Sequence, residues 1–167
     1  MKRGVSLIAL AALTLVSSPA APQTFDAQGR AIDGDTVAVD FRLLGVDAFE
    51  RRQLCRNASG CWTCGKAAQD FAAKALRSGA ATISLRPSSS YGRPVATVRV
   101  AGQDLGERMI RAGLAIPQVQ YLRHDPARSR RYATAFTQAK AGRAGAFAGS
   151  WLEPSRWRRG ERLRCER

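Results

Sequence analysis

One ten-residue stretch carries most of what the sequence indicates about fold and chemistry, and it reads FRLLGVDAFE from Phe41 to Glu50. Its first six residues, 41–46, are apolar enough to predict a β-strand. Asp47 and Glu50 follow at once, three positions apart, so one carboxylate can face a metal ion while the other faces a water molecule beside it. The stretch therefore predicts a polar site just beyond a short strand.

An acidic cluster surrounds this stretch in a chain whose formal net charge is +14. Carboxylates held together repel one another unless a cation neutralises them, and hard oxygen ligands suit Ca²⁺ or Mg²⁺. Arginines accompany the cluster, and a guanidinium matches phosphate oxygens with a fork of fixed geometry. A metal beside arginines suits a phosphodiester, on whose oxygens charge builds in the transition state. The residues concerned are Asp33, Asp35, Asp40, Asp47, Glu50, Arg42 and Arg93.

Each of these residues also has a simpler interpretation. Asp33 and Asp35 flank a glycine, and such pairs often serve only as turns. Asp40 is better explained as an exposed turn residue than as a ligand. Glu50 precedes two arginines with which it could form a surface ion pair, and Arg93 could be solvated.

The N-terminus has the pattern of a secretory signal peptide, expected over residues 1–21. Lys2 and Arg3 precede an apolar stretch over 5–16, and small residues follow it at plausible cleavage positions. An apolar stretch of this length is short for a membrane span. We expect an exported protein, periplasmic or secreted, with no stable membrane insertion after cleavage.

The charge balance indicates an affinity for polyanions. Without Lys2 and Arg3 the chain keeps 25 basic against 13 acidic residues. Such a surface attracts nucleic acid through long-range steering and counterion release. Solubility alone, or adhesion to an acidic envelope, would explain the same charge.

Four cysteines, Cys55, Cys61, Cys64 and Cys165, allow three disulfide pairings, among which the sequence does not choose. The spacing of Cys61 and Cys64 also fits a redox motif or half of a zinc site. Structural disulfides are favoured, because no thioredoxin-like context or second ligand pair is visible. The working hypothesis is Cys55–Cys64 with Cys61–Cys165.

The remaining pattern predicts one α+β domain over residues 22–158, followed by a basic C-terminal tail over 159–167. Strands are expected over 36–39, 41–46, 81–85 and 94–100, with a turn over 88–92 and an irregular polar loop over 48–65. Helices are expected over 66–78, 104–113 and 125–141, the last two beginning at capping aspartates. A small barrel of about five strands with packed helices fits these elements.

Five motifs in order resemble the staphylococcal (micrococcal) nuclease family, in its exported bacterial branch. They are IDGDTV at 32–37, FRLLGVDAFE at 41–50, YGR at 91–93, DLGERMIRAGLA at 104–115 and GAFAGSW at 145–151. The likeness extends over about residues 25–158, and the order of the five makes it specific. The resemblance implies an OB-fold five-stranded β-barrel with three helices.

The resemblance also implies Ca²⁺-dependent cleavage of DNA and RNA with 3′-phosphate products. Asp35, Asp47 and the backbone carbonyl of Ala48 match the metal ligands. Glu50 matches the general base, or the residue that positions the attacking water. Arg42 and Arg93 match the phosphate-binding arginines, and Tyr91 and Tyr121 fall near positions where the family places tyrosines beside the nucleotide.

Three departures from the family pattern affect the placement of these groups. The segment between Asp35 and Arg42 is short, Phe49 replaces a usual proline, and Ser89 replaces an aspartate before the Tyr-Gly-Arg turn. The alternative to a nuclease is therefore a catalytically inactive nucleic-acid-binding OB-fold protein, and a cationic envelope-binding protein is a third hypothesis. Nothing in the sequence demands more than a monomer.

Overall fold

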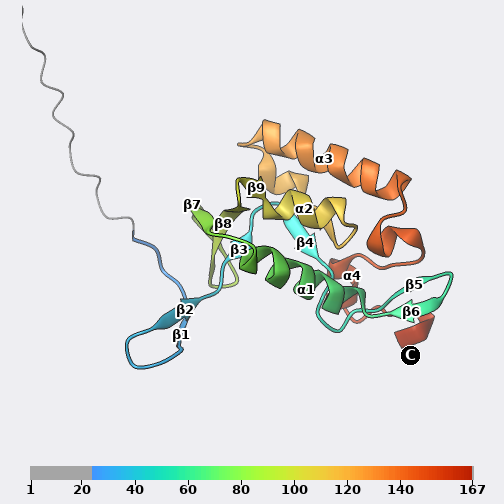
Figure 1. Cartoon of the computed structure of the whole chain (residues 1–167), viewed down its shortest axis with the longest axis horizontal. Helices are drawn as coiled ribbons and strands as arrows, with labels where there is room; N and C mark the ends of the chain where they lie inside the picture. The colour runs from blue at the N-terminus through green and yellow to red at the C-terminus, as the bar shows by residue number, and fades with distance from the viewer. Residues whose placement is uncertain (1–23, 167) are drawn as a thin grey trace, which may run out of the picture.

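The computed structural model describes residues 24–166, in which helices pack beside several short sheets (Figure 1). The expected signal peptide, residues 1–21, lies outside this range. Within the range, none of the helices is long and apolar enough to cross a membrane. The helices are α1 (Cys64–Arg77), α2 (Leu105–Arg111), α3 (Pro126–Ala141) and α4 (Pro154–Arg158), with 3₁₀ turns η1 (Val119–Leu122), η2 (Gly145–Ala148) and η3 (Arg164–Glu166).

The strands form four separate hydrogen-bonded sheets. In the largest, β8 lies between β7 and the short parallel strand β3, and β9 also pairs with β8; the other sheets are the pairs β1–β2, β4–β10 and β5–β6. Across residues 24–166 these pairings do not close into a barrel. The strands are β1 (Gly29–Ala31), β2 (Val37–Val39), β3 (Arg42–Leu43), β4 (Val46–Ala48), β5 (Cys55–Asn57), β6 (Gly60–Trp62), β7 (Ala81–Ser90), β8 (Arg93–Val100), β9 (Gln103–Asp104) and β10 (Ala115–Pro117).

The continuous strand predicted over 41–46 is wrong, because a turn at Leu44 and Gly45 divides it into β3 and the start of β4. Gly45 has a φ of 68°, which favours glycine. A Cβ at this position would also lie only 2.7 Å from the Leu122 side chain. The apolar run does not reveal the turn, since the residues around Gly45 are all suited to strands.

The turn between β7 and β8 is tighter than the predicted loop over 88–92. Ser90 pairs directly with Arg93, which leaves Tyr91 and Gly92 as a two-residue connection. Their φ angles of 52° and 73° are both positive, as a type I′ hairpin turn requires. β7 therefore extends to Ser90, with an irregularity in its pairing between Leu85 and Ser89.

The helices behave largely as predicted. The Asp104 side chain accepts a hydrogen bond from the Glu107 amide and caps α2, and the Asp125 side chain caps α3 in the same way before Pro126. α2 lies between α1 and α3 in Figure 1 and packs against both, so its buried Met109 and Ile110 contribute to the main core.

A second apolar cluster lies beyond the acidic end of β4. Phe49, which replaces the family's proline, is only 3% exposed and packs edge-on against Phe147 and Trp151. The irregular loop predicted over 48–65 is wrong in part, because the hairpin β5–β6 lies within it. A cysteine on each of these strands forms a disulfide, and that covalent framework holds a hairpin too short for a periodic pattern to reveal.

Candidate active site

Asp47 is the centre of the site, because its buried carboxylate contacts two arginines from distant parts of the chain. The residue is 2% exposed. Arg42 Nη2 donates to Asp47 Oδ1 at 2.8 Å. Arg158 donates from Nη1 to Oδ1 at 3.1 Å and from Nη2 to Oδ2 at 2.9 Å. Hydrogen bonding to Asp47, joined by that to Glu50, holds the pKa of Arg158 above its usual value.

The backbone of β4 directs two carbonyls to one side. The Gly45 carbonyl accepts a hydrogen bond from the Gln118 amide and the Phe49 amide donates to the Leu114 carbonyl, so both ends of β4 are joined to the β10 side. In an antiparallel ladder the residues between such positions face the opposite edge, so the carbonyls of Val46 and Ala48 point away from β10. Arg42 Nη2 agrees with this direction, since it also donates to the Val46 carbonyl at 3.0 Å. The Ala48 carbonyl therefore faces the same edge as the Arg42 guanidinium.

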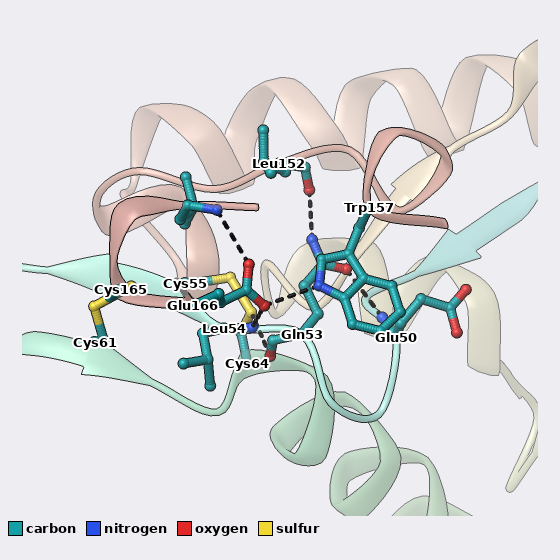
Figure 2. The surroundings of a disulfide bond; sticks show 11 residues. Glu50, Gln53, Leu54, Cys55, Cys61, Cys64, Leu152, Trp157, Cys165 and Glu166 are labelled. Carbon is teal, nitrogen blue, oxygen red and sulfur yellow. Dashed lines mark hydrogen bonds between the residues drawn. A yellow bond between two sulfur atoms is a disulfide. The ribbon is translucent and has the colours of Figure 1, made fainter. Parts of the chain in front are cut away.

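Glu50 is held at this edge by a buried glutamine. The Glu50 amide donates to Gln53 Oε1 at 3.1 Å, and Gln53 Nε2 donates to the Leu152 carbonyl at 2.8 Å (Figure 2). Gln53 is fully buried. The Glu50 carboxylate points away from Gln53 in Figure 2 and accepts a hydrogen bond from Arg158 Nη1 at 2.6 Å. Gln53 thus fixes the backbone of Glu50 and leaves its side chain at the site.

Helix α1 approaches the Glu50 backbone very closely at its N-terminal end. Gly65 is buried there, and a Cβ built on it would lie 1.6 Å from the Glu50 carbonyl oxygen. Any side chain at this position would push the helix and the Glu50 segment apart. Glycine is therefore required for the observed spacing.

The C-terminal segment, residues 149–166, reaches the site because it is anchored at several points. Glu166 accepts hydrogen bonds at 2.8 Å from both the Leu54 amide and Trp157 Nε1 (Figure 2). The structure contains the disulfides Cys55–Cys64 and Cys61–Cys165, the pairing that the working hypothesis preferred. α4 packs against β4 and so presents Arg158 to the carboxylates.

Asp35 lies in a different place. It is exposed in the connection between β1 and β2, where the Thr36 hydroxyl donates to it at 3.3 Å. This hairpin projects away from β4 in Figure 1. Among residues 24–166, no three His, Cys, Asp or Glu side chains gather closely enough to hold a metal ion.

Of the other expected binding residues, Arg93 and Tyr91 lie on or beside β8, and Tyr121 lies in η1. The register places Arg42 opposite Val95, so Arg93, two residues earlier on β8, shares a face with Arg42. Tyr91 is 95% exposed at the β7–β8 turn, and Tyr121 is 67% exposed in η1. The structure thus unites Arg42, Asp47 and Glu50, and places Arg93 on the strand next to β3.

Two residues of the site, Arg158 and Gln53, were not predicted from the sequence. The C-terminal end is rich in arginine, but no periodicity indicates which arginine returns to β4. Gln53 stands in a segment without a strand or helix pattern, so its burial has no sequence signal. Only the proximity of Cys55 and Cys165 to these segments indicated that they are constrained.

The donor atoms at the site suit the cation that the resemblance implies. The carboxylates of Asp47 and Glu50 and the Ala48 carbonyl are hard oxygen ligands of the kind Ca²⁺ prefers. In this arrangement, however, guanidinium groups contact both oxygens of Asp47. The oxygen donors fit calcium by chemistry, and the Arg158 guanidinium contacts both acids.

Comparison with known proteins adds one match. The family profile described as "Staphylococcal nuclease homologue" matches residues 40–148. No curated protein matches the chain significantly. The match includes Arg42, Asp47, Glu50 and Arg93 but neither Asp35 nor Arg158, and the family implies an OB-type fold, as the sequence predicted.

Proposed function

The chain belongs to the staphylococcal nuclease homologue family, and on that premise we propose that it is an exported, Ca²⁺-dependent phosphodiesterase of low sequence specificity that hydrolyses DNA and RNA. Family membership supports nuclease activity in general. The finer elements of the proposal are the cation, the export, the substrate range and the 3′-phosphate products.

One observation carries the proposal: Asp47 and Glu50 stand together with arginines at one edge of β4. A protein that only binds nucleic acid needs basic residues, but it has no use for two carboxylates on a surface that must attract phosphates. Water attack on a phosphodiester needs both signs of charge, one to accept a proton and one to stabilise the phosphate oxygens.

The residues take distinct roles in this proposal. Glu50 accepts a proton from the attacking water, or orients that water, with its backbone fixed by Gln53. Arg42 and Arg93 bind the phosphate oxygens from neighbouring strands. Asp47 and the Ala48 carbonyl would hold the cation, and Ca²⁺ would supply positive charge beside the scissile phosphate. Asp35, the further ligand that the resemblance implied, lies apart from them on the β1–β2 hairpin.

Export and a polyanionic substrate have separate support. Two disulfides are compatible with an oxidising compartment outside the cytosol. The formal net charge of +14 favours nucleic acid through sequence-independent contacts with its phosphates. A monomer suffices for the site, because every residue assigned to it comes from one chain.

A catalytically inactive nucleic-acid-binding protein is the second candidate. The placement of Asp35 favours it, since this carboxylate is exposed on the β1–β2 hairpin rather than beside Asp47. Under this alternative the basic surface binds nucleic acid, but Asp35 does not join Asp47 as a metal ligand.

Digestion of heat-denatured DNA and of RNA distinguishes the two. We expect cleavage with added Ca²⁺, none with a chelator, and a loss of roughly 10²–10⁴-fold in rate for Glu50→Gln, the usual size of a general-base contribution. Glu153→Gln is the matched control, because Glu153 is exposed at the start of α4. Equal cleavage with chelator would exclude the calcium mechanism, and binding without cleavage would favour the second candidate.

A further inference from the structure

A single guanidinium bridges the two acids of the site. Nη1 of Arg158 lies 3.1 Å from Asp47 Oδ1 and 2.6 Å from Glu50 Oε1, and its Nη2 lies 2.9 Å from Asp47 Oδ2. Two carboxylates that repel each other thus share one positive group. A divalent cation held by Asp47 would have to displace this guanidinium from the Asp47 carboxylate.

Arg158 lies outside the family-matched residues 40–148, and several contacts hold its backbone in place. Its neighbour Trp157 donates to Glu166 and packs against Arg162, whose guanidinium carbon lies 4.1 Å from the centre of the indole ring. Glu166 lies next to Cys165, which is bridged to the β5–β6 hairpin. The backbone that carries Arg158 is therefore held near β4 whether or not its side chain contacts the acids.

The side chain itself can leave, because it is 44% exposed, whereas the Asp47 side chain is 3% exposed. Release of the guanidinium requires only rotation of a long side chain into solvent. Asp47 would keep its contact with Arg42, but Glu50 would lose the only side-chain partner described for it in residues 24–166. Of the two guanidinium groups that contact Asp47, that of Arg158 is the more exposed, at 44% against 30% for Arg42.

We propose that Arg158 is a positioning residue of the nuclease site, which holds Asp47 and Glu50 together and competes with the divalent cation for the Asp47 carboxylate. This inference rests on the proposed Ca²⁺-dependent function. It assigns to the C-terminal segment a direct part in setting how much Ca²⁺ the site requires. Removing the guanidinium should expose both acids to the cation and strengthen its binding.

Calorimetric titration of the whole protein with Ca²⁺, without nucleic acid, tests the proposal. We expect Arg158→Gln to bind Ca²⁺ about fivefold more tightly, the size of a contact with a half-exposed guanidinium. The Ca²⁺ affinity of Arg158→Lys should fall between those of the wild type and Arg158→Gln, because an ammonium keeps the charge but not the forked geometry of the guanidinium. The control is Arg159→Gln, which removes the same charge from a side chain that is 66% exposed and lies 4.0 Å from Glu161, its one ion-pair partner within residues 24–166.

The outcomes separate this inference from the proposed function. Tighter binding by Arg158→Gln alone, with a lower Ca²⁺ concentration for half-maximal DNA cleavage, supports it. Unchanged or weaker binding by that variant, while wild-type cleavage still requires Ca²⁺, overturns the inference and leaves the proposed function intact. If neither the wild type nor any variant binds Ca²⁺, and a chelator does not affect cleavage, both the inference and the proposed function are overturned.

Discussion

Two flanks extend beyond the family-matched residues 40–148, and they differ in how they relate to the site. The N-terminal flank, residues 24–39, carries Asp35, the carboxylate that the family resemblance implied as a ligand. It forms an exposed two-stranded hairpin apart from β4 (Figure 1). The C-terminal flank, residues 149–166, carried no residue in the implied active site, yet it brings Arg158 into contact with Asp47 and Glu50.

The difference comes from anchoring rather than from distance along the sequence. An isolated two-stranded hairpin buries little apolar surface and is marginally stable in water. Ile32 and Val37 are 61% and 73% exposed, so β1 and β2 contribute little to a core. The C-terminal flank is tied by a disulfide and by Glu166. A segment that is covalently held can position a side chain that a loosely packed hairpin cannot.

The largest effect should follow from removing the C-terminal anchor. Cys61→Ser with Cys165→Ser opens a bridge between residues 104 positions apart. Loss of a disulfide that closes a loop of this length should destabilise the folded state by roughly 2–5 kcal/mol. Urea unfolding at neutral pH measures the change.

The corresponding change in the other flank is Arg30→Gln, which removes the exposed ion pair between Arg30 and Asp40. It should alter the free energy of unfolding by no more than about 0.5 kcal/mol. Similar losses from both changes would mean that the two flanks are held equally well, contrary to the comparison above.

A smaller but clear difference should separate the two aspartates. Asp47→Asn removes the charge that holds Arg42 and Arg158, and should lower the free energy of unfolding by about 1–3 kcal/mol, less than for a fully buried pair because both arginines are partly exposed. Asp35→Asn should change it by about 0.5 kcal/mol or less.

Urea unfolding of both variants in chelator measures this difference without any contribution from bound cations. If Asp35→Asn destabilised the chelated protein as much as Asp47→Asn, the hairpin would have to pack on the site rather than project from it. That result would support the metal site that the resemblance implied, in which Asp35 lies beside Asp47 and the Ala48 carbonyl.

Glu166→Gln should have a still smaller effect on the C-terminal flank. The carboxylate accepts hydrogen bonds from the Leu54 amide and Trp157 Nε1, and an amide oxygen at the same place accepts them more weakly. We expect a loss of about 1 kcal/mol. Because Trp157 loses part of this contact, the tryptophan fluorescence of Glu166→Gln should change at urea concentrations below the main unfolding transition. A single transition identical to that of the wild type would argue that Glu166 does not anchor this segment.

How far the sequence predicted the structure depends on the kind of signal. The capping aspartates Asp104 and Asp125 identified the starts of α2 and α3, because local hydrogen bonding decides helix ends. The turn at Gly45 was missed, since the residues around it all suit strands. The disulfide pairing was one of three that spacing allowed.

The site was predicted where its residues are close in sequence and missed where they are not. Arg42, Asp47 and Glu50 lie within one short stretch, so their closeness along the chain indicated a common site even though the strand expected over 41–46 is divided at Gly45. Arg158 is 111 positions from Asp47, and no local pattern encodes a contact of that range. Its place depends on a disulfide and on the packing of Trp157, which only the folded chain reveals.

The smallest expected effect concerns acid titration within the C-terminal flank. The hydrogen bond from Arg156 holds the pKa of the Glu161 carboxyl below its usual value. A lowered folded-state pKa stabilises the protein above the unfolded pKa of about 4.3, and this stabilisation is lost as the pH falls through the folded pKa. Glu161→Gln should therefore lower the urea midpoint slightly at pH 7 and leave it unchanged near pH 2. An equal difference at both pH values would assign the effect to packing rather than to charge.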